Sequence, residues 1–535
     1  MMEHRRQHNT VFLVIAAVFC LYAALFIYRT SFVIEGERYF SLFDDAMISM
    51  RYARNLASGH GLVWNPGGDR MEGYTNLLWT LYMAAMHLVP VAQSKASLLV
   101  QISSALLLLA NLIFVRKLSR AIARDSGFIE TGALLLTAFY LPLNGWSLQG
   151  MEVGLLALLL TAAAWKAVSA LKEDGFSPWP YVLLAVGMLV RLDASVPFLA
   201  VLLLMVLKDP ARRKRHLVYG ISIFAVALIA QTLFRVLYYG EFLPNSYYLK
   251  ITGFPFIFRI TRGLYVTFVS VWRMNWVLFL VGFVLLLKPR RLEHSILLAL
   301  FVAQLAYSIY VGGDAWESWG GANRYVSIVM PCFFVAYMCG LDRIGVWIRA
   351  RIPESRPDLS PARIGRIARL AKVEILVLSF ISFNAIYGPA ALTELILLKP
   401  TLHVDKNETM VERALAVRRM TRDDASIAVV WDGAIPYFAD RHTVSILGKN
   451  DRLIARGKMR VPSGPEKLVA FYPGHLKWDY AHSIGRLKPD VVVQLWHARE
   501  EASSFLAVNY VPAEVGAFTF YLRRGSPRVL WDKTD

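Results

Sequence analysis

Two adjacent acids, Asp44 and Asp45, begin a polar segment that lies between apolar stretches of the chain. A carboxylate in such a position can act as a general base, and a second carboxylate can tune its pKa or orient a hydroxyl group. The acids could also be solvated loop charges, or Asp45 could cap a helix over residues 46–57. The spacing of the two residues alone favours these simpler interpretations.

Cations follow the two acids. Arg51 and Arg54 lie on the same expected helix, and a phosphate or pyrophosphate on a lipid carrier needs such groups near the membrane interface. Contacts with lipid headgroups explain them as well. Farther along the chain, Arg235 and Lys250 flank a tyrosine-rich loop. Tyrosines at an interface are normally an anchoring belt, but charges among them favour a sugar or phosphate site.

Two other segments carry charges in unusual surroundings. Asp314 lies near Trp316 and Arg324, and tryptophan beside a carboxylate suits both carbohydrate stacking and an interfacial aromatic girdle. Arg191 and Asp193 interrupt a long apolar stretch, where ionisable groups are costly and rarely accidental. A structural ion pair at a helix break is the safer assignment for these two residues.

The composition indicates what must position these groups. The chain has 535 residues, of which 56% are hydrophobic and 18% charged, with a mean hydropathy of +0.44, which is typical of a polytopic membrane protein. The net charge of +19 could suggest nucleic acid, but the basic residues cluster between apolar spans as the positive-inside rule predicts. The three cysteines lie in apolar runs and form no disulfide or metal motif. No nucleotide-binding glycine motif is present, so a cytosolic nucleotide-using enzyme is unsupported.

The apolar segments predict a polytopic α-helical membrane protein with about eleven transmembrane helices, occupying residues 1–395. Basic residues at the start place the N-terminus in the cytoplasm, so the first loop, residues 29–96, lies outside. Residues 77–91 are expected to form an interfacial helix on the outer surface. The long segment with Arg191 is expected to be two short helices joined at residues 191–195.

The composition changes after this region, and residues 400–535 predict an extracytoplasmic α/β domain. Its side of the membrane follows from the odd number of crossings. The expected strands cover residues 426–431, 443–447, 467–471, 491–495 and 517–522, and an expected helix covers residues 408–420.

Several segments together resemble known proteins. The segments are RYARNLASGHGLVWNPGGDRMEGYTN after the two acids, YYGEFLPNSYYLK, GGDAWESWGGANRY, WDGAIPYFADRHTVSILGKNDRLIA and YPGHLKWDY. In this combination the chain resembles the GT-C superfamily of membrane glycosyltransferases, and within it the bacterial terminal β-(1→2)-arabinofuranosyltransferase family. The resemblance covers nearly the whole chain.

The resemblance implies an inverting glycosyltransferase of the bacterial inner membrane. It would move a sugar, expected to be D-arabinofuranose, from a polyprenyl (decaprenyl) phosphate donor to a cell-envelope glycan, glycolipid or protein on the outer face. One alternative is a GT-C transferase that uses another polyprenyl-phosphate sugar, such as mannose or aminoarabinose. Another is a flippase for lipid-linked sugar, although the inverted repeat typical of transporters is not visible. An envelope scaffold whose C-terminal domain is a binding module is a third class.

The resemblance also implies roles for individual residues. Asp44 matches the base in the first outer loop, with Asp45 beside it. The candidates for the donor phosphate are Arg51, Arg235, Lys250 and Arg324. The candidates for the sugar or acceptor are His60, Glu72, Tyr74, Asn245, Tyr247, Asp314 and Trp316. No cofactor is predicted; some GT-C enzymes use a divalent metal, but the sequence shows too few convergent carboxylates to assign one.

Overall fold

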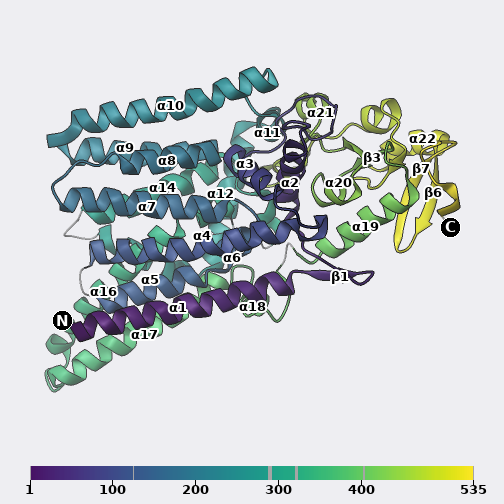
Figure 1. The fold of residues 1–535 in the computed structure, drawn as a ribbon. Coiled ribbons are helices and arrows are strands. Elements are labelled where there is room, and N and C mark those ends of the chain that lie inside the picture. The colour runs from purple at the N-terminus through teal and green to yellow at the C-terminus, as the bar shows by residue number, and fades with distance from the viewer. Residues whose placement is uncertain (1, 124–125, 287–291, 320–322, 402–403, 534–535) are drawn as a thin grey trace.

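The computed structural model describes residues 2–123, 126–286, 292–319, 323–401 and 404–533. Long helices lie roughly side by side in a bundle, and an α/β domain packs against one end of it (Figure 1). The N-terminus lies at the opposite end of the bundle from this domain, as Figure 1 shows.

Within the described residues, six helices are long and apolar enough to cross a membrane, judged by length and composition. They are α1 (Met2–Arg29), α4 (Gln93–Ile122), α7 (Val153–Lys172), α10 (Arg213–Tyr239), α14 (Leu292–Tyr310) and α16 (Met330–Ser355). The number rises to eight if each of two sharply bent helix pairs is one span. The pairs are α11 (Asn245–Ile251) with α12 (Phe256–Arg273), and α17 (Pro361–Asn384) with α18 (Pro389–Leu395).

The expected count of about eleven crossings is not confirmed, because several expected spans are shorter than the ~20 residues that a bilayer requires. The short elements are α5 (Gly127–Ala138), α6 (Leu141–Leu148), α8 (Trp179–Val190), α9 (Ser195–Lys208) and α13 (Trp276–Leu280), the last continued by a 3₁₀ segment over Val281–Leu286.

The predicted helix break at residues 191–195 is confirmed. Helix α8 ends at Val190, a 3₁₀ turn covers Leu192–Ala194, and α9 begins at Ser195. Arg191 leaves the helical conformation with φ of −148° and donates to Asp193 and to Glu152, the latter at 2.8 Å. The arginine thus carries two carboxylate partners at the break, as a buried charge requires.

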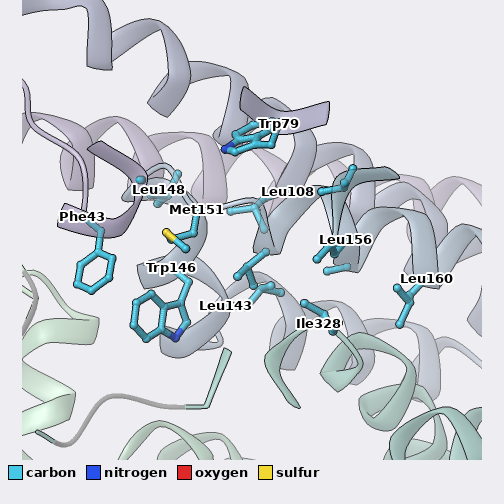
Figure 2. Close-up of a cluster of buried hydrophobic side chains, with 14 of the residues drawn as sticks. Phe43, Trp79, Leu108, Leu143, Trp146, Leu148, Met151, Leu156, Leu160 and Ile328 are labelled. Carbon is cyan, nitrogen blue, oxygen red and sulfur yellow. The ribbon is translucent and has the colours of Figure 1, made fainter. Parts of the chain in front are cut away.

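The first loop packs onto the bundle rather than extending from it. It contains a hairpin of β1 (Phe32–Ile34) and β2 (Glu37–Tyr39), then α2 (Asp44–Ala57) and α3 (Leu77–Met86). Helix α3 is shorter than the expected helix over residues 77–91, and its Trp79 indole is buried and donates to the Gly150 carbonyl at 2.9 Å. Phe43 anchors the start of α2. Its ring packs edge-on against the Trp146 ring, with the two ring centres 5.1 Å apart, within the buried cluster of Figure 2.

The C-terminal domain is built on a five-stranded sheet of order β4-β3-β5-β7-β6. The strands are β3 (Ser426–Val429), β4 (His442–Ser445), β5 (Val491–Val492), β6 (Tyr510–Val515) and β7 (Phe518–Arg523). The strand pairs β3–β4 and β3–β5 are parallel, and the pairs that include β7 are antiparallel. The main helices are α19 (Asn407–Met420), α20 (Ala434–Ala439), α21 (Arg452–Arg456) and α22 (Glu500–Asn509).

Four of the five strands expected in this region are present, and the strand expected over residues 467–471 is wrong. A 3₁₀ turn covers Pro465–Leu468 instead, with Lys467 and Val469 donating to carbonyls three residues earlier in the chain. Gly464 and Pro465 favour this turn, because proline fixes φ and provides no N–H for a sheet. Strand β6 was not predicted.

Arg51 joins the first loop to the C-terminal domain. Its buried guanidinium donates to the Trp64 carbonyl at 2.6 Å and to the carbonyls of Pro436 and Arg441. A further bond at 2.8 Å reaches the Asn65 side chain. A planar guanidinium can donate in several fixed directions at once, which lysine cannot.

We expect Arg51→Lys to destabilise this junction by about 2 to 4 kcal/mol, because several buried carbonyls lose their donor. Thermal unfolding in detergent and proteolysis near residue 400 measure the effect. Arg419→Lys is the matched control, since the ion pair of Arg419 with Glu35 is exposed. Equal behaviour of the two variants would contradict this role of Arg51.

Candidate active site

The two acids open helix α2, whose N-cap is Phe43. The expectation that Asp45 caps a helix over residues 46–57 is therefore wrong, since the helix starts at Asp44 and no side chain caps it. The carboxylates of both acids are used instead in contacts with distant parts of the chain. Acids in the first turn also interact favourably with the helix dipole.

Asp45 is held between two cations. Its Oδ2 accepts from Nη1 of Arg324 at 3.1 Å, and its Oδ1 lies 3.2 Å from Nζ of Lys449 in the C-terminal domain. Burial opposes ionisation of Asp45, but the positive charges of Lys449 and Arg324 outweigh it and hold its pKa below the usual range. Asp45 is therefore an ionised, fully engaged carboxylate.

Asp44 has a different environment. Its Oδ1 accepts from the backbone N–H of Ala434 at 2.9 Å, while its Oδ2 is buried without a hydrogen-bond partner among the described residues. Burial raises the pKa of Asp44, against the opposing charge of Lys449. An oxygen with an unused lone pair and a raised pKa is suited to accept a proton.

The C-terminal sheet delivers residues to both acids. The segment after β3 continues through Trp431 to Gly433, and the segment after β4 carries Lys449. A Cβ on Gly433 would lie 2.0 Å from the backbone oxygen of Asp44, so only glycine permits this close approach. The carboxyl edge of the sheet thus faces the start of α2, as is usual for sites of open α/β sheets.

A cavity of about 230 Å³ lies beside these groups, between the bundle and the C-terminal domain. Lys449 lines it together with seven residues that were predicted for the site: Asp45, Glu72, Tyr74, Arg235, Tyr247, Lys250 and Arg324. Arg191, Asp193 and Glu152 line the same cavity, so the ion pairs at the helix break form part of its wall.

Most cations of the cavity have carboxylate partners. Arg324 is paired with Asp314 at 2.9 Å as well as with Asp45, and Arg235 is paired with Glu72. Lys250 makes no hydrogen bond or ion pair with any residue that the structure describes. A partly buried cation without a partner is available to a bound anion.

Comparison with known proteins supports a relationship over part of the chain. Residues 401–529 match a family described as a domain of unknown function (DUF8728). A terminal β-(1→2)-arabinofuranosyltransferase of Mycobacterium tuberculosis is 28% identical over 218 residues, which are 38% of this chain and 34% of that protein. The chain thus matches about a third of the length of this relative.

The fold as a whole resembles solved membrane enzymes. ArnT from Cupriavidus metallidurans bound to undecaprenyl phosphate superposes with a TM-score of 0.56 at 11% identity, over 97% of this chain and 98% of ArnT. The oligosaccharyltransferase of Archaeoglobus fulgidus tethered to an acceptor peptide gives 0.55 at 12% identity, over 99% of this chain and 77% of that chain. The chain has a GT-C glycosyltransferase fold.

Within this GT-C fold, three of the predicted residues make contacts that hold other side chains or segments of the site in place. Asn245 donates to the carbonyls of Gly448 and Lys449, both at 2.9 Å, and so positions the segment that carries the lysine. Asp314 orients Arg324, as described above. The Trp316 ring is buried against Phe43 at 4.8 Å and is also 6.1 Å from the Trp431 ring.

Six predicted residues do not line the cavity. Asp44, Asn245 and Asp314 are next in the chain to residues that do, and Trp316 packs against Phe43 beside the acids. The other two, His60 and Arg51, lie farther away. His60 is exposed and does not line it. Arg51 is buried, with its guanidinium committed to the carbonyls at the domain junction. The distance between Arg51 and the acids along α2 explains this placement, because two turns of helix carry it away from the start that faces the cavity.

Three residues at the site were not predicted: Lys449, Asp432 and His475. His475 donates from Nδ1 to the Pro473 carbonyl at 2.9 Å, and its Nε2 is buried without a partner among the described residues. Burial, with the charge of Lys449, lowers the pKa of His475 to about 3, so its ring is neutral. All three lie in C-terminal segments that carried the family resemblance, which was the available signal.

The part of the chain that the structure describes contains no group of three or more His, Cys, Asp or Glu side chains placed to hold a metal ion. The carboxylates nearest the cavity are directed to cations, as for Asp45 and Glu72. The described residues around the cavity therefore do not fit a metal site.

Asp432 provides a pH-dependent test of this environment. Burial raises its pKa from 3.8 to about 7, so between these values the folded chain holds a proton that the unfolded chain releases. The contribution of Asp432 to stability is therefore present at low pH and is lost as the pH rises towards 7 and above.

The melting temperature of Asp432→Asn minus that of the unmodified chain should therefore be larger at pH 8 than at pH 5. Thermal unfolding across this range measures the difference. Asp405→Asn, which removes an exposed carboxylate, should show a constant difference. A constant difference for Asp432→Asn would contradict the protonated state.

Proposed function

We propose that this protein is an inverting glycosyltransferase that moves a sugar from a polyprenyl-phosphate donor to a hydroxyl group of an envelope acceptor. The observation that carries the proposal is the arrangement of Asp44 and Lys250. Oδ2 of Asp44 is buried without a hydrogen-bond partner among the described residues. The neighbouring Asp45 lines a cavity in which Lys250 makes no ion pair with any residue that the structure describes. The proteins that the chain resembles are glycosyltransferases, one solved with undecaprenyl phosphate and another with dolichol phosphate.

In the proposed reaction, Oδ2 of Asp44 takes the proton of the acceptor hydroxyl as its oxygen bonds to the anomeric carbon. The bond between that carbon and the phosphate oxygen breaks, and the phosphate leaves with the electron pair. Attack from the face opposite the leaving group inverts the anomeric centre. The Ala434 N–H holds the other carboxylate oxygen, which fixes the direction of the free one.

Charge on the departing phosphate needs compensation, which we assign to the cations of the cavity. We assign Lys250 a direct contact with the phosphate because no described carboxylate pairs with it. Arg324 and Lys449 share Asp45, so their charges are only partly neutralised. Arg235, held by Glu72, contributes a fixed positive group at the same wall. Tyr74 and Tyr247 line the cavity where the sugar would lie.

The finer identity of the substrates is part of the proposal. D-arabinofuranose as the sugar is supported by the printed activity of the mycobacterial relative. Mannose and aminoarabinose donors are the alternatives. A glycan, a glycolipid and a protein are candidate acceptors, and the acceptor peptide bound to the archaeal oligosaccharyltransferase shows that this fold can present a peptide. We place the protein in the bacterial inner membrane with the C-terminal domain outside and the N-terminus in the cytoplasm.

Asp44→Asn should lower the rate of sugar transfer by about a thousandfold, because the amide cannot accept the proton. Purified enzyme with polyprenyl-phosphate arabinose, and with the mannose donor for comparison, provides the assay. Asp69→Asn is the control, since Asp69 is an exposed acid of the same loop. Wild-type rates in the Asp44 variant would refute its role as base.

Lys250→Met should lower kcat/KM for the donor by about tenfold or more, because the leaving phosphate loses a cation in a partly buried site. Steady-state kinetics with varied donor measures this, and direct binding of undecaprenyl phosphate should weaken in parallel. Lys458→Met, which removes an exposed lysine, is the matched control. Unchanged phosphate binding in the Lys250 variant would remove this lysine from the site.

A further inference from the structure

A second cavity, of about 800 Å³, lies within the C-terminal domain. The residues after β3 and β5 form one part of its wall, through Trp431, Gln494 and Trp496. Phe518 of β7 and Arg413 of α19 form another part. Its volume is within the range of sites that bind small ligands.

The position of this cavity follows from the sheet topology. In the sheet, β3 lies between β4 and β5. The chain passes from β3 to β4 on one side and then crosses to β5 on the other side, so the direction of winding changes between β3 and β5. Open parallel sheets bind ligands at the carboxyl ends of the strands at such a switch point. Gln494 lies there, with its side-chain oxygen accepting from the N–H groups of Val430 and Trp431, both at 3.3 Å.

Arg413 is the side chain that most clearly requires a ligand. It is half-buried, with its guanidinium 4.7 Å from the Phe518 ring centre, and its Nε is buried without a hydrogen-bond partner. Its guanidinium makes no hydrogen bond or ion pair with any described residue. Leaving the buried Nε without an acceptor is costly, and burial also lowers the pKa of Arg413.

Aromatic rings connect this cavity to the candidate active site. The Trp496 ring meets Trp431 edge-on at 5.8 Å, and Trp431 lies 6.1 Å from Trp316 beside Phe43. Nζ of Lys449, which holds Asp45, is 5.8 Å from the Trp431 ring. Trp431 therefore borders the cavity on one side and contacts residues around the acids on the other.

We propose that this C-terminal cavity binds saccharide units of the acceptor, with aromatic rings stacking on the sugar and the Arg413 guanidinium donating to its hydroxyl groups. The inference rests on the proposed transferase function, which it extends by assigning a role to the C-terminal domain. The bound chain would run along Trp496 and Trp431 and present its terminal hydroxyl to Asp44.

The lining fits a saccharide better than a lipid or a nucleotide. Sugars present apolar ring faces edged by hydroxyl groups, which suit aromatic rings beside amide and guanidinium groups. Two arginines, Arg413 and Arg499, and one glutamate, Glu500, leave a net charge of only +1 at the wall. A phosphate site would favour a larger cluster of cations without a carboxylate among them. A polyprenyl tail would favour an apolar wall without such groups.

The test measures binding of tetrasaccharides of arabinofuranose and of mannose to the full chain in lipid nanodiscs, by calorimetry and saturation-transfer NMR. We expect saturable binding of at least one tetrasaccharide, weakened by about tenfold or more in Arg413→Gln and in Trp496→Ala. Arg413→Gln is the decisive variant, because Trp496 also donates to the His475 carbonyl and its loss could disturb the fold. Arg422→Gln and Trp531→Ala, which change side chains near the amino end of β3, should bind normally.

The outcomes separate this site from the proposed activity. Asp44→Asn should bind the tetrasaccharide with unchanged affinity although its rate of sugar transfer is strongly lowered. Undecaprenyl phosphate should not displace the tetrasaccharide. An inactive protein that still binds saccharide through Arg413 would refute the transferase function and support the site. The site is overturned if an active enzyme binds neither saccharide, if binding is indifferent to Arg413→Gln, or if undecaprenyl phosphate competes.

Discussion

The ion pairs of Asp45 with Arg324 and Lys449 connect the three parts of the chain that form the site. Asp45 belongs to the first loop, Arg324 to the short helix α15 (Arg324–Ser327), and Lys449 to the C-terminal domain. Each cation is buried and costly without its partner. The same contacts set the position of α2, and therefore of Asp44. Asn245 donates to the backbone carbonyls of Gly448 and Lys449, and Asp314 accepts from the guanidinium of Arg324, so both cations are held in place.

Adjacent acids on one helix acquire different chemistry from their surroundings. Two positive charges keep Asp45 ionised. Asp44 instead faces backbone N–H groups of the C-terminal domain, and its Oδ2 is buried without a partner among the described residues. Two residues of the same type thus have carboxyl groups with different pKa values because their surroundings differ. Gly433 makes the separation possible, because its lack of a Cβ lets the sheet edge approach Asp44.

The sequence predicted the features that leave a local signal. The helix break at Arg191 was predictable because a charge within an apolar run has few alternatives, and most strands followed from short β-rich runs. The number of crossings was not confirmed, because apolar runs such as residues 127–138 are too short to decide between a span and a packed helix. Lys449 could not be predicted from local pattern, since it meets Asp45 across 404 residues of chain. Arg51 had the right residue type for phosphate, but its geometry is set by tertiary contacts with carbonyl groups.

The separation of Asp45 and Lys449 has a consequence for biosynthesis. A ribosome makes the two acids early and the lysine only after more than four-fifths of the chain, so the nascent bundle carries Asp45 without one of its cations. In that interval Asp44 is also without the N–H of Ala434, which aligns its carboxylate. The candidate site is thus incomplete until the C-terminal domain has folded against the bundle. A nascent chain that ends before Ala434 therefore lacks both the N–H that aligns Asp44 and the lysine that pairs with Asp45.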